Sequence, residues 1–250
     1  MRYFIEFAYN GTRFHGWQMQ PNAKTIQQTL QHAIKTILKR NIELVGAGRT
    51  DAGVHALQLF AHFDFDEIFV KETVIYKLNA ILPVDIVVKN IVEVNDAAHA
   101  RFDAVSRSYE YHIHFGKNPF NNELTWQLKN KKLDVNKMNK AAEVLLTYTN
   151  FKSFSRSKTD VKTYDCKIYE AYWKLDNNQL IFYITANRFL RNMVRAIVGT
   201  LVEIGEGKTT LENFKTIIEN KDRTKAGPSA PAKGLFLTKV KYPENIFKNE

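Results

Sequence analysis

Residues 25–65 read TIQQTLQHAIKTILKRNIELVGAGRTDAGVHALQLFAHFDF and carry most of the information about the fold. Within 26–38, apolar side chains recur every three or four positions, which predicts a helix with one apolar face. Thr25, with Gln28 three residues later, is typical of a capping box at the start of that helix. Residues 57–65 alternate apolar with other side chains, which predicts a strand.

Outward from this stretch, four further features complete a β-α-β-β-α-β order. A strand is predicted over 42–45, and an alternating pattern predicts another over 2–9. A helix over 72–82 is expected to end at Pro83, because proline cannot continue a helix. A strand over 85–94 follows. This order is the split unit called ferredoxin-like.

The second half of the chain predicts a looser pass through the same order. We expect strands over 107–115, 163–175, 179–186 and 235–242, helices over 136–148, 188–205 and 211–220, and a crossover over 118–132. The predicted fold class is α+β, with two ferredoxin-like α/β halves and a mixed, mainly antiparallel sheet. We place the halves at 1–104 and at 105–250. A central cleft is expected between them, as the place for a functional site.

Composition excludes several classes of protein. With 44% hydrophobic residues the chain of 250 residues is not disordered throughout, and no apolar run is long enough for a membrane helix. Charged residues near the start argue against a secretory signal peptide. Cys166 is the single cysteine, so no disulfide forms within the chain and no structural zinc site is expected. We therefore expect a cytoplasmic protein.

The charge balance indicates a polyanionic partner. Lysine and arginine number 36 against 26 acidic residues, a formal net charge of +10. A surplus of this size favours nucleic acid, although a solvated basic surface is the plainer interpretation. Aromatic residues make up 12% of the chain, and some of them can serve as platforms for base stacking.

Segment 46–56, GAGRTDAGVHA, is the clearest candidate for a functional site. Its three glycines allow a tight turn and a close approach of a ligand to the backbone. Arg49, Asp51 and His55 are concentrated in this turn, beside an apolar strand. The alternative is a glycine-rich turn in which Arg49 and Asp51 simply pair with each other.

His112 and His114 lie on one face of a predicted strand and are candidates for two metal ligands. No third ligand is evident nearby, so packing or RNA contact is the preferred interpretation. We expect no metal site.

Segment 46–56 resembles the signature of the bacterial tRNA pseudouridine synthase A family. Further blocks that resemble this family follow one another in order from residue 9 to residue 242. They are YNGTRFHGWQ at 9–18, HARF at 99–102, RSYEY at 107–111, FLRNMVR at 189–195, GTL at 199–201, DR at 222–223, AG at 226–227, AP at 230–231 and GL at 234–235. Departures occur at Ala98, Arg188, Arg191 and 152–174, where RNA contacts and substrate range are affected rather than the chemistry.

The resemblance implies an isomerase that converts uridine to pseudouridine at positions 38–40 of the tRNA anticodon stem-loop. The glycosidic N–C bond breaks, the uracil rotates, and a C–C bond forms to the same ribose carbon. It further implies a homodimer that binds tRNA, without a metal or an organic cofactor.

The resemblance places the nucleophile at Asp51. One carboxylate is sufficient for an isomerisation, whereas a hydrolytic glycosidase uses two. A cation beside this carboxylate keeps it ionised, and the family match assigns that role to Arg195. The alternative for Arg195 is an ordinary surface charge on a helix.

Four residues are expected to contact the substrate. Tyr109 matches the family tyrosine that stacks on the target uracil, and it is also the catalytic candidate for taking the proton from C5. Stacking is the preferred role, because tyrosine is a poor base near neutral pH, and a core tyrosine on a strand is the alternative. Leu235 is expected to pack against the uracil, Arg49 to hold or extrude the RNA, and His55 to line the same site. Candidates for phosphate contacts are Lys152, Arg156, Lys158, Arg188, Arg191 and Lys225.

Two other functions compete with this interpretation. One is a non-catalytic tRNA-binding or tRNA-folding protein on the same scaffold, and the other is a relative that modifies another RNA position. A basic surface suits all three, but only an enzyme requires Asp51.

Overall fold

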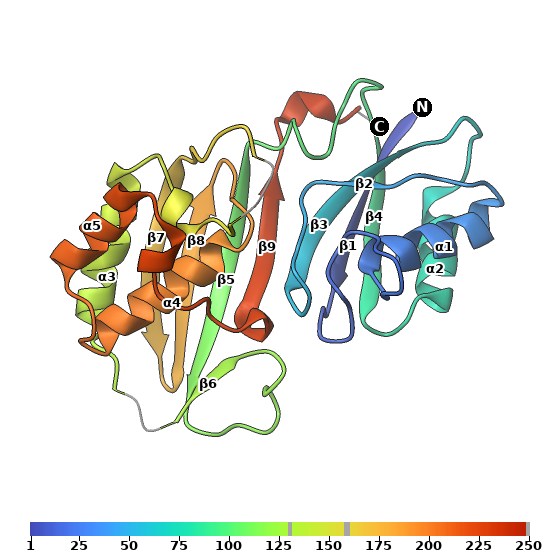
Figure 1. The fold of residues 1–250 in the computed structure, drawn as a ribbon. Coiled ribbons are helices and arrows are strands. Elements are labelled where there is room, and N and C mark those ends of the chain that lie inside the picture. The colour runs from blue at the N-terminus through green and yellow to red at the C-terminus, as the bar shows by residue number, and fades with distance from the viewer. Residues whose placement is uncertain (130–131, 158–160, 249–250) are drawn as a thin grey trace. The chain divides into compact units, whose positions relative to one another are not determined.

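A computed structural model of the chain describes residues 1–129, 132–157 and 161–248. The chain forms two compact units (Figure 1). The first consists of Met1–Val105 and the segment from Phe236 onward, and the second of Ser106–Leu235. The C-terminal segment is thus grouped with the first unit, whereas the sequence analysis assigned it to the second half. The predicted division of the chain into residues 1–104 and 105–250 remains a prediction.

The first unit has the ferredoxin-like order expected from the sequence. Its elements are β1 (Arg2–Tyr9), α1 (Ile26–Leu38), β2 (Val45–Gly46), β3 (His55–Asp64), α2 (Lys71–Ile81), β4 (Ile86–Val94) and most of β9 (Leu235–Lys241). Neighbouring strands follow the order β4-β1-β3, and β2 pairs with β3. These pairs are antiparallel, whereas β3 and β9 pair in parallel.

Helices α1 and α2 lie on one face of these strands (Figure 1). The register brings Ile5 of β1 opposite Ala61 of β3 and Ile91 of β4, and all three are buried. The apolar face of α1 is buried as predicted, and the backbone N–H of Gln28 donates to the Thr25 hydroxyl. The core of this unit therefore follows from the alternation in the sequence.

The predicted strand over 42–45 is wrong, since only Val45–Gly46 pairs as β2. Side chains of α1 bind the backbone of Leu44 instead. The side-chain amide of Gln27 donates to the Leu44 carbonyl over 2.8 Å, and the Leu44 N–H donates to the side-chain oxygen Oε1 of Gln31 over 3.4 Å. Because these side chains occupy its backbone groups, residue 44 does not join the sheet.

The second unit repeats part of the same order. Its elements are β5 (Ser106–Phe115), β6 (Trp126–Leu128), α3 (Val135–Val144), β7 (Ile168–Asp176), β8 (Gln179–Ala186), α4 (Met193–Gly205) and α5 (Leu211–Asn220). Strands β5, β8 and β7 are antiparallel neighbours, while β6 pairs with β5 in parallel. The α+β class with mixed, mainly antiparallel strands is therefore confirmed. Short 3-10 helices occur at Leu145–Thr147, Lys152–Phe154, Arg223–Lys225, Ala232–Gly234 and Glu244–Ile246.

Several boundaries in this unit differ from expectation. Strand β7 begins at Ile168 rather than at residue 163, and α3 ends at Val144 rather than at residue 148. Helix α4 begins at Met193 rather than at residue 188, because Asn192 has a left-handed backbone with φ of 66°. The predicted crossover over 118–132 contains β6, and its residues 130–131 lie outside the described residues. None of the helices in the described part of the chain has the length and hydropathy needed to cross a bilayer.

Candidate active site

The loop that contains Asp51 is held in place by the loop after β1. The Trp17 N–H donates to the Thr50 carbonyl over 3.2 Å, and the Gly53 N–H donates to the Phe14 carbonyl over 3.3 Å. The hydroxyls of Tyr9 and Thr50 are hydrogen-bonded at 2.8 Å. These bonds fix the backbone on both sides of Asp51, whose side chain is half-buried.

Glycine is required where the two loops meet. Gly16 has φ of +86°, and a side chain there would place its Cβ 2.3 Å from the Thr50 carbonyl oxygen. A Cβ at Gly11 would lie 2.0 Å from the Val54 carbonyl oxygen. Close backbone approach, rather than a phosphate-binding role, therefore accounts for these two glycines.

Arg49 and His55 have different surroundings on this loop. Arg49 is exposed, which is compatible with the predicted contact to RNA. His55 is only 1% exposed, because its ring stacks on Phe236 with the ring centres 4.6 Å apart. Its Nδ1 accepts a hydrogen bond from the Gly11 N–H over 3.0 Å. Substrate contact by His55 stays a prediction, while its role in fixing the loop follows from these bonds.

Three further candidates belong to the second unit. Tyr109 is half-buried on β5, with its ring edge-on to Phe189 at 5.0 Å. Leu235, the first residue of β9, is buried. Arg195 lies on α4, where the other side chains except Glu203 are buried. Asp51, Arg49 and His55 are therefore grouped in one unit, and Tyr109, Arg195 and Leu235 in the other.

Arg195 is fixed by the loop before β9. Its Nε donates to the Ala230 carbonyl over 2.7 Å, and the Ala230 N–H donates to the Arg195 carbonyl over 2.9 Å. This pair of bonds joins residues 35 positions apart in the chain. Orientation of a guanidinium by a backbone carbonyl limits its freedom and directs its remaining N–H groups.

Arg223 and Tyr111 complete this arrangement, although the sequence analysis gave neither a role. Arg223 donates to the carbonyls of Ala226 and Gly227 and to the Ser229 hydroxyl, and burial lowers its pKa. The buried Tyr111 hydroxyl donates to the Pro231 carbonyl over 2.8 Å. Burial raises the pKa of Tyr111, so this group stays protonated and acts as a donor. Arg223 lies in the block 222–223 and Tyr111 in the block 107–111, so the sequence contained a signal for both residues.

Gly199→Ala tests how closely the loop and α4 must pack. A Cβ at this position would lie 1.7 Å from the Pro228 carbonyl oxygen. This oxygen belongs to the backbone, so relieving the clash requires a shift of the loop or of α4 that costs free energy. We expect the free energy of unfolding to fall by about 1–3 kcal/mol. Chemical denaturation measures this, with Gly48→Ala as the control, because nothing lies within 4 Å of a Cβ at Gly48. Equal stability of the two variants would contradict the predicted close packing.

The basic candidates in the described residues lie in the second unit. Lys152, Arg156, Arg191 and Lys225 are exposed and Arg188 is half-buried, while Lys158 lies outside the described residues. The Arg156 N–H donates to the Arg191 carbonyl over 3.0 Å, so these two residues are neighbours.

The two candidate metal ligands have other environments. His112 is hydrogen-bonded through Nε2 to Glu110 at 2.9 Å. The buried Nδ1 of His114 has no hydrogen-bond partner. Among residues 1–129, 132–157 and 161–248, no three His, Cys, Asp or Glu side chains form a possible metal site.

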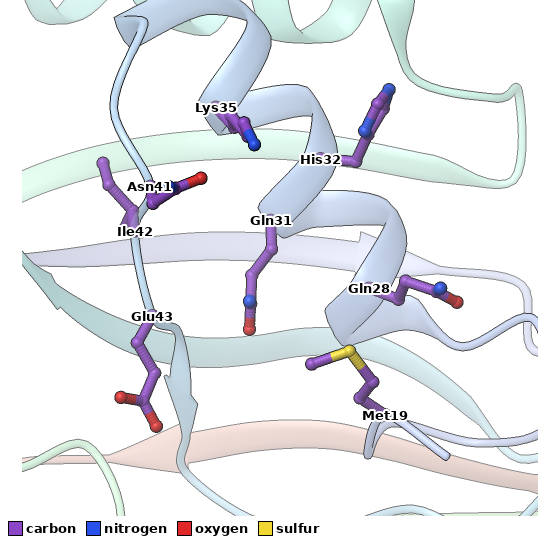
Figure 2. A pocket seen from close by; sticks show the side chains of 8 residues that line it. All are labelled: Met19, Gln28, Gln31, His32, Lys35, Asn41, Ile42 and Glu43. Carbon is purple, nitrogen blue, oxygen red and sulfur yellow. The ribbon is translucent and has the colours of Figure 1, made fainter. Parts of the chain in front are cut away.

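A groove of about 380 Å³ lies beside α1. It is bounded by Met19, by side chains of α1 and by residues 41–43 (Figure 2). None of the predicted site residues lines it. Most of the residues that line it are polar and exposed.

Comparisons with known proteins define the class of this chain. A family model described as tRNA pseudouridine synthase matches residues 6–103 and 141–243. A protein named tRNA pseudouridine synthase A from Bacteroides thetaiotaomicron is 51% identical over 100% of this chain and 93% of its own length. Proteins of the same name from Parabacteroides distasonis and Limosilactobacillus reuteri are 50% and 41% identical, each over at least 99% of both chains.

The chain thus has the fold and the sequence of an RNA-modifying isomerase. It belongs to the tRNA pseudouridine synthase family, as the match over most of its length establishes. The resemblance seen in the sequence is confirmed, and so is the assignment as an enzyme.

Proposed function

We propose that this protein converts uridine to pseudouridine at positions 38–40 of the tRNA anticodon stem-loop. The name shared by its relatives supports tRNA as the substrate. The resemblance of the sequence to the bacterial tRNA pseudouridine synthase A family supports the positions. The observation that carries the catalytic part is the half-buried Asp51 on a loop whose backbone is bonded on both sides.

Asp51 is the proposed nucleophile. It attacks the uridine while the bond between N1 of uracil and C1′ of ribose breaks, and the uracil then turns within the site. When C5 bonds to C1′, the bond to Asp51 breaks and the carboxylate is regenerated. The proton on C5 then leaves, and N1 takes up a proton. Because the nucleoside keeps its atoms and its oxidation state, the reaction requires neither water nor a cofactor.

The remaining site residues have proposed roles in binding and electrostatics. Arg195 is the proposed cationic partner of the Asp51 carboxylate, the role that the family resemblance assigns to it. Tyr109 stacks on the uracil and Leu235 packs against it, since aromatic and apolar surfaces replace the stacking lost when a base leaves its helix. Arg49 holds or extrudes the RNA, as its exposure allows. His55 lines the site.

A homodimer and a cytoplasmic location are proposed on the family resemblance alone. Light scattering of the purified protein tests the first, and fractionation of the producing cells tests the second. A monomer at micromolar concentration would contradict the proposed dimer.

Mapping of the modified positions tests the proposed function. The purified protein is incubated with an unmodified tRNA transcript that has uridines at positions 38, 39 and 40, and pseudouridine is located by carbodiimide labelling and primer extension. We expect product at one or more of these positions. A transcript with cytidine at all three serves as the control and should remain unmodified. Modification elsewhere, or none at all, would contradict the proposal.

A further inference from the structure

Residues 95–105 form a loop that is fixed to the first unit at several points. The Ala100 N–H donates to Nδ1 of His62 on β3 over 3.1 Å, and the Ala100 carbonyl accepts from the Tyr242 hydroxyl. Arg2 of β1 donates to the Ala98 carbonyl over 2.9 Å. Ala98 and Ala100 are both buried. This loop is therefore a fixed part of the unit.

Three rings contact one another in a row from the strand to the surface. His62 and His99 meet edge to face with their centres 4.6 Å apart, and the tilted rings of His99 and Phe102 have centres 4.3 Å apart. His62 is 5% exposed, whereas Phe102 is 72% exposed. The guanidinium carbon of Arg101 lies over the Phe102 ring, 5.6 Å from its centre. Phe102 is thus a large apolar ring that is exposed to solvent and packs against His99 on its protein side.

Hydrogen bonds hold the supporting histidines in one orientation. Nδ1 of His99 accepts from the N–H groups of Arg101 and Phe102 over 3.1 Å and 3.3 Å. Both His99 and His62 therefore carry an unprotonated Nδ1. Burial lowers the pKa of His62 to about 4 and is also the largest cause of the lowered pKa of His99. Because neutral imidazole rings do not repel the Arg101 guanidinium, the contacts among His62, His99 and Phe102 persist at neutral pH.

We propose that Phe102 is a second RNA contact, at which its ring stacks on an unpaired base of tRNA while Arg101 approaches the phosphate of that nucleotide. A ring with its rotamer already fixed loses little entropy on binding. The cation beside it suits a nucleotide rather than a purely apolar partner, and the chain carries a net charge of +10. This inference rests on the proposed function, in which tRNA is the substrate.

The contact lies far from the target uridine within this unit. His62, which supports Phe102 through His99, is seven residues beyond His55 on β3. At about 3.4 Å per residue, His62 lies roughly 24 Å from the end of this strand that is nearer to Asp51 in the chain. A base on Phe102 is therefore neither the target base nor its immediate neighbour. We therefore place this base in a part of tRNA outside the anticodon hairpin.

Binding of full-length tRNA to Phe102 variants tests this. We expect Phe102→Ala to raise the dissociation constant about tenfold, within the roughly 5- to 150-fold range for one stacked base. Phe102→Trp should retain affinity, and Phe102→Leu should lose it, because stacking requires a π face. The control is Ile68→Ala, since Ile68 is a 93% exposed apolar residue of the same unit. All measurements use one salt concentration, and thermal unfolding verifies that the variants fold.

Binding of a second RNA distinguishes a failure of this inference from a failure of the proposed function. An isolated anticodon hairpin should bind wild-type protein and Phe102→Ala with equal affinity. Unaltered affinity of Phe102→Ala for full-length tRNA would overturn the inference, as would equal affinity of Phe102→Leu and wild type. A changed oligomeric state in Phe102→Ala would make the ring a protein contact and would overturn it too. Failure of the proposed function would appear instead as wild-type protein that forms no pseudouridine.

Discussion

Asp51→Asn is expected to lower the rate of pseudouridine formation by about 10⁴-fold or more, while tRNA binding stays within about twofold. The amide has nearly the same shape as the carboxylate, so the loop bonds at Thr50 and Gly53 should persist. It is uncharged and a far weaker nucleophile, so neither bond formation to the ribose nor stabilisation of positive charge is available. Single-turnover kinetics with excess enzyme measures the chemical step, and filter binding measures affinity.

The control for this substitution is Asp66→Asn. Asp66 is a fully exposed carboxylate of the same unit, so its change removes the same charge without touching the Asp51 loop. Retained binding with loss of product in Asp51→Asn alone distinguishes an enzyme from a tRNA-binding protein. Turnover by Asp51→Asn at the wild-type rate would refute the assignment of the nucleophile.

Arg195→Met is expected to reduce turnover roughly 10²- to 10³-fold, and to reduce it more than it weakens tRNA binding. The substitution removes the cation proposed to keep Asp51 ionised. It also leaves the Ala230 carbonyl, in a 1% exposed residue, without its 2.7 Å donor, which costs about 1–3 kcal/mol in stability. The rate constant at saturating tRNA and the Michaelis constant are measured together across pH.

Arg195→Lys and Arg40→Met are the comparisons for this variant. Lysine restores the charge without the planar donor geometry, so we expect partial recovery of turnover. Arg40 is an exposed residue of the first unit that pairs with Glu67 over 2.7 Å, so its change should leave turnover unaltered. An effect of Arg195→Met on affinity alone would mean that this residue only contacts phosphate.

Most of the architecture could be predicted, because helix and strand periods are local properties. The burial of Ile26, Leu30 and Ile34 on α1 follows from their spacing. The failed prediction over 42–45 has a non-local cause, since Gln27 and Gln31 of α1 bind the Leu44 backbone. Apolar alternation does not reveal such competition for backbone groups.

The candidate site could be predicted less completely. Segment 46–56 stands out because arginine, aspartate and histidine occur together among glycines. Nothing in that pattern indicates that His55 is covered by Phe236 or that Gly11 donates to it. Exposure depends on what packs over a residue, and such neighbours lie far away in the chain.

By itself, the sequence determined the order of helices and strands, the basic character and the aspartate loop, because each depends on residue types and their spacing. Tertiary structure alone decided that Ala230 orients Arg195 and that His62 and His99 support an exposed Phe102. The physical reason is that a hydrogen bond or a ring stack depends on a few ångströms of separation. Folding brings distant residues to that separation, and their positions in the chain do not encode it directly.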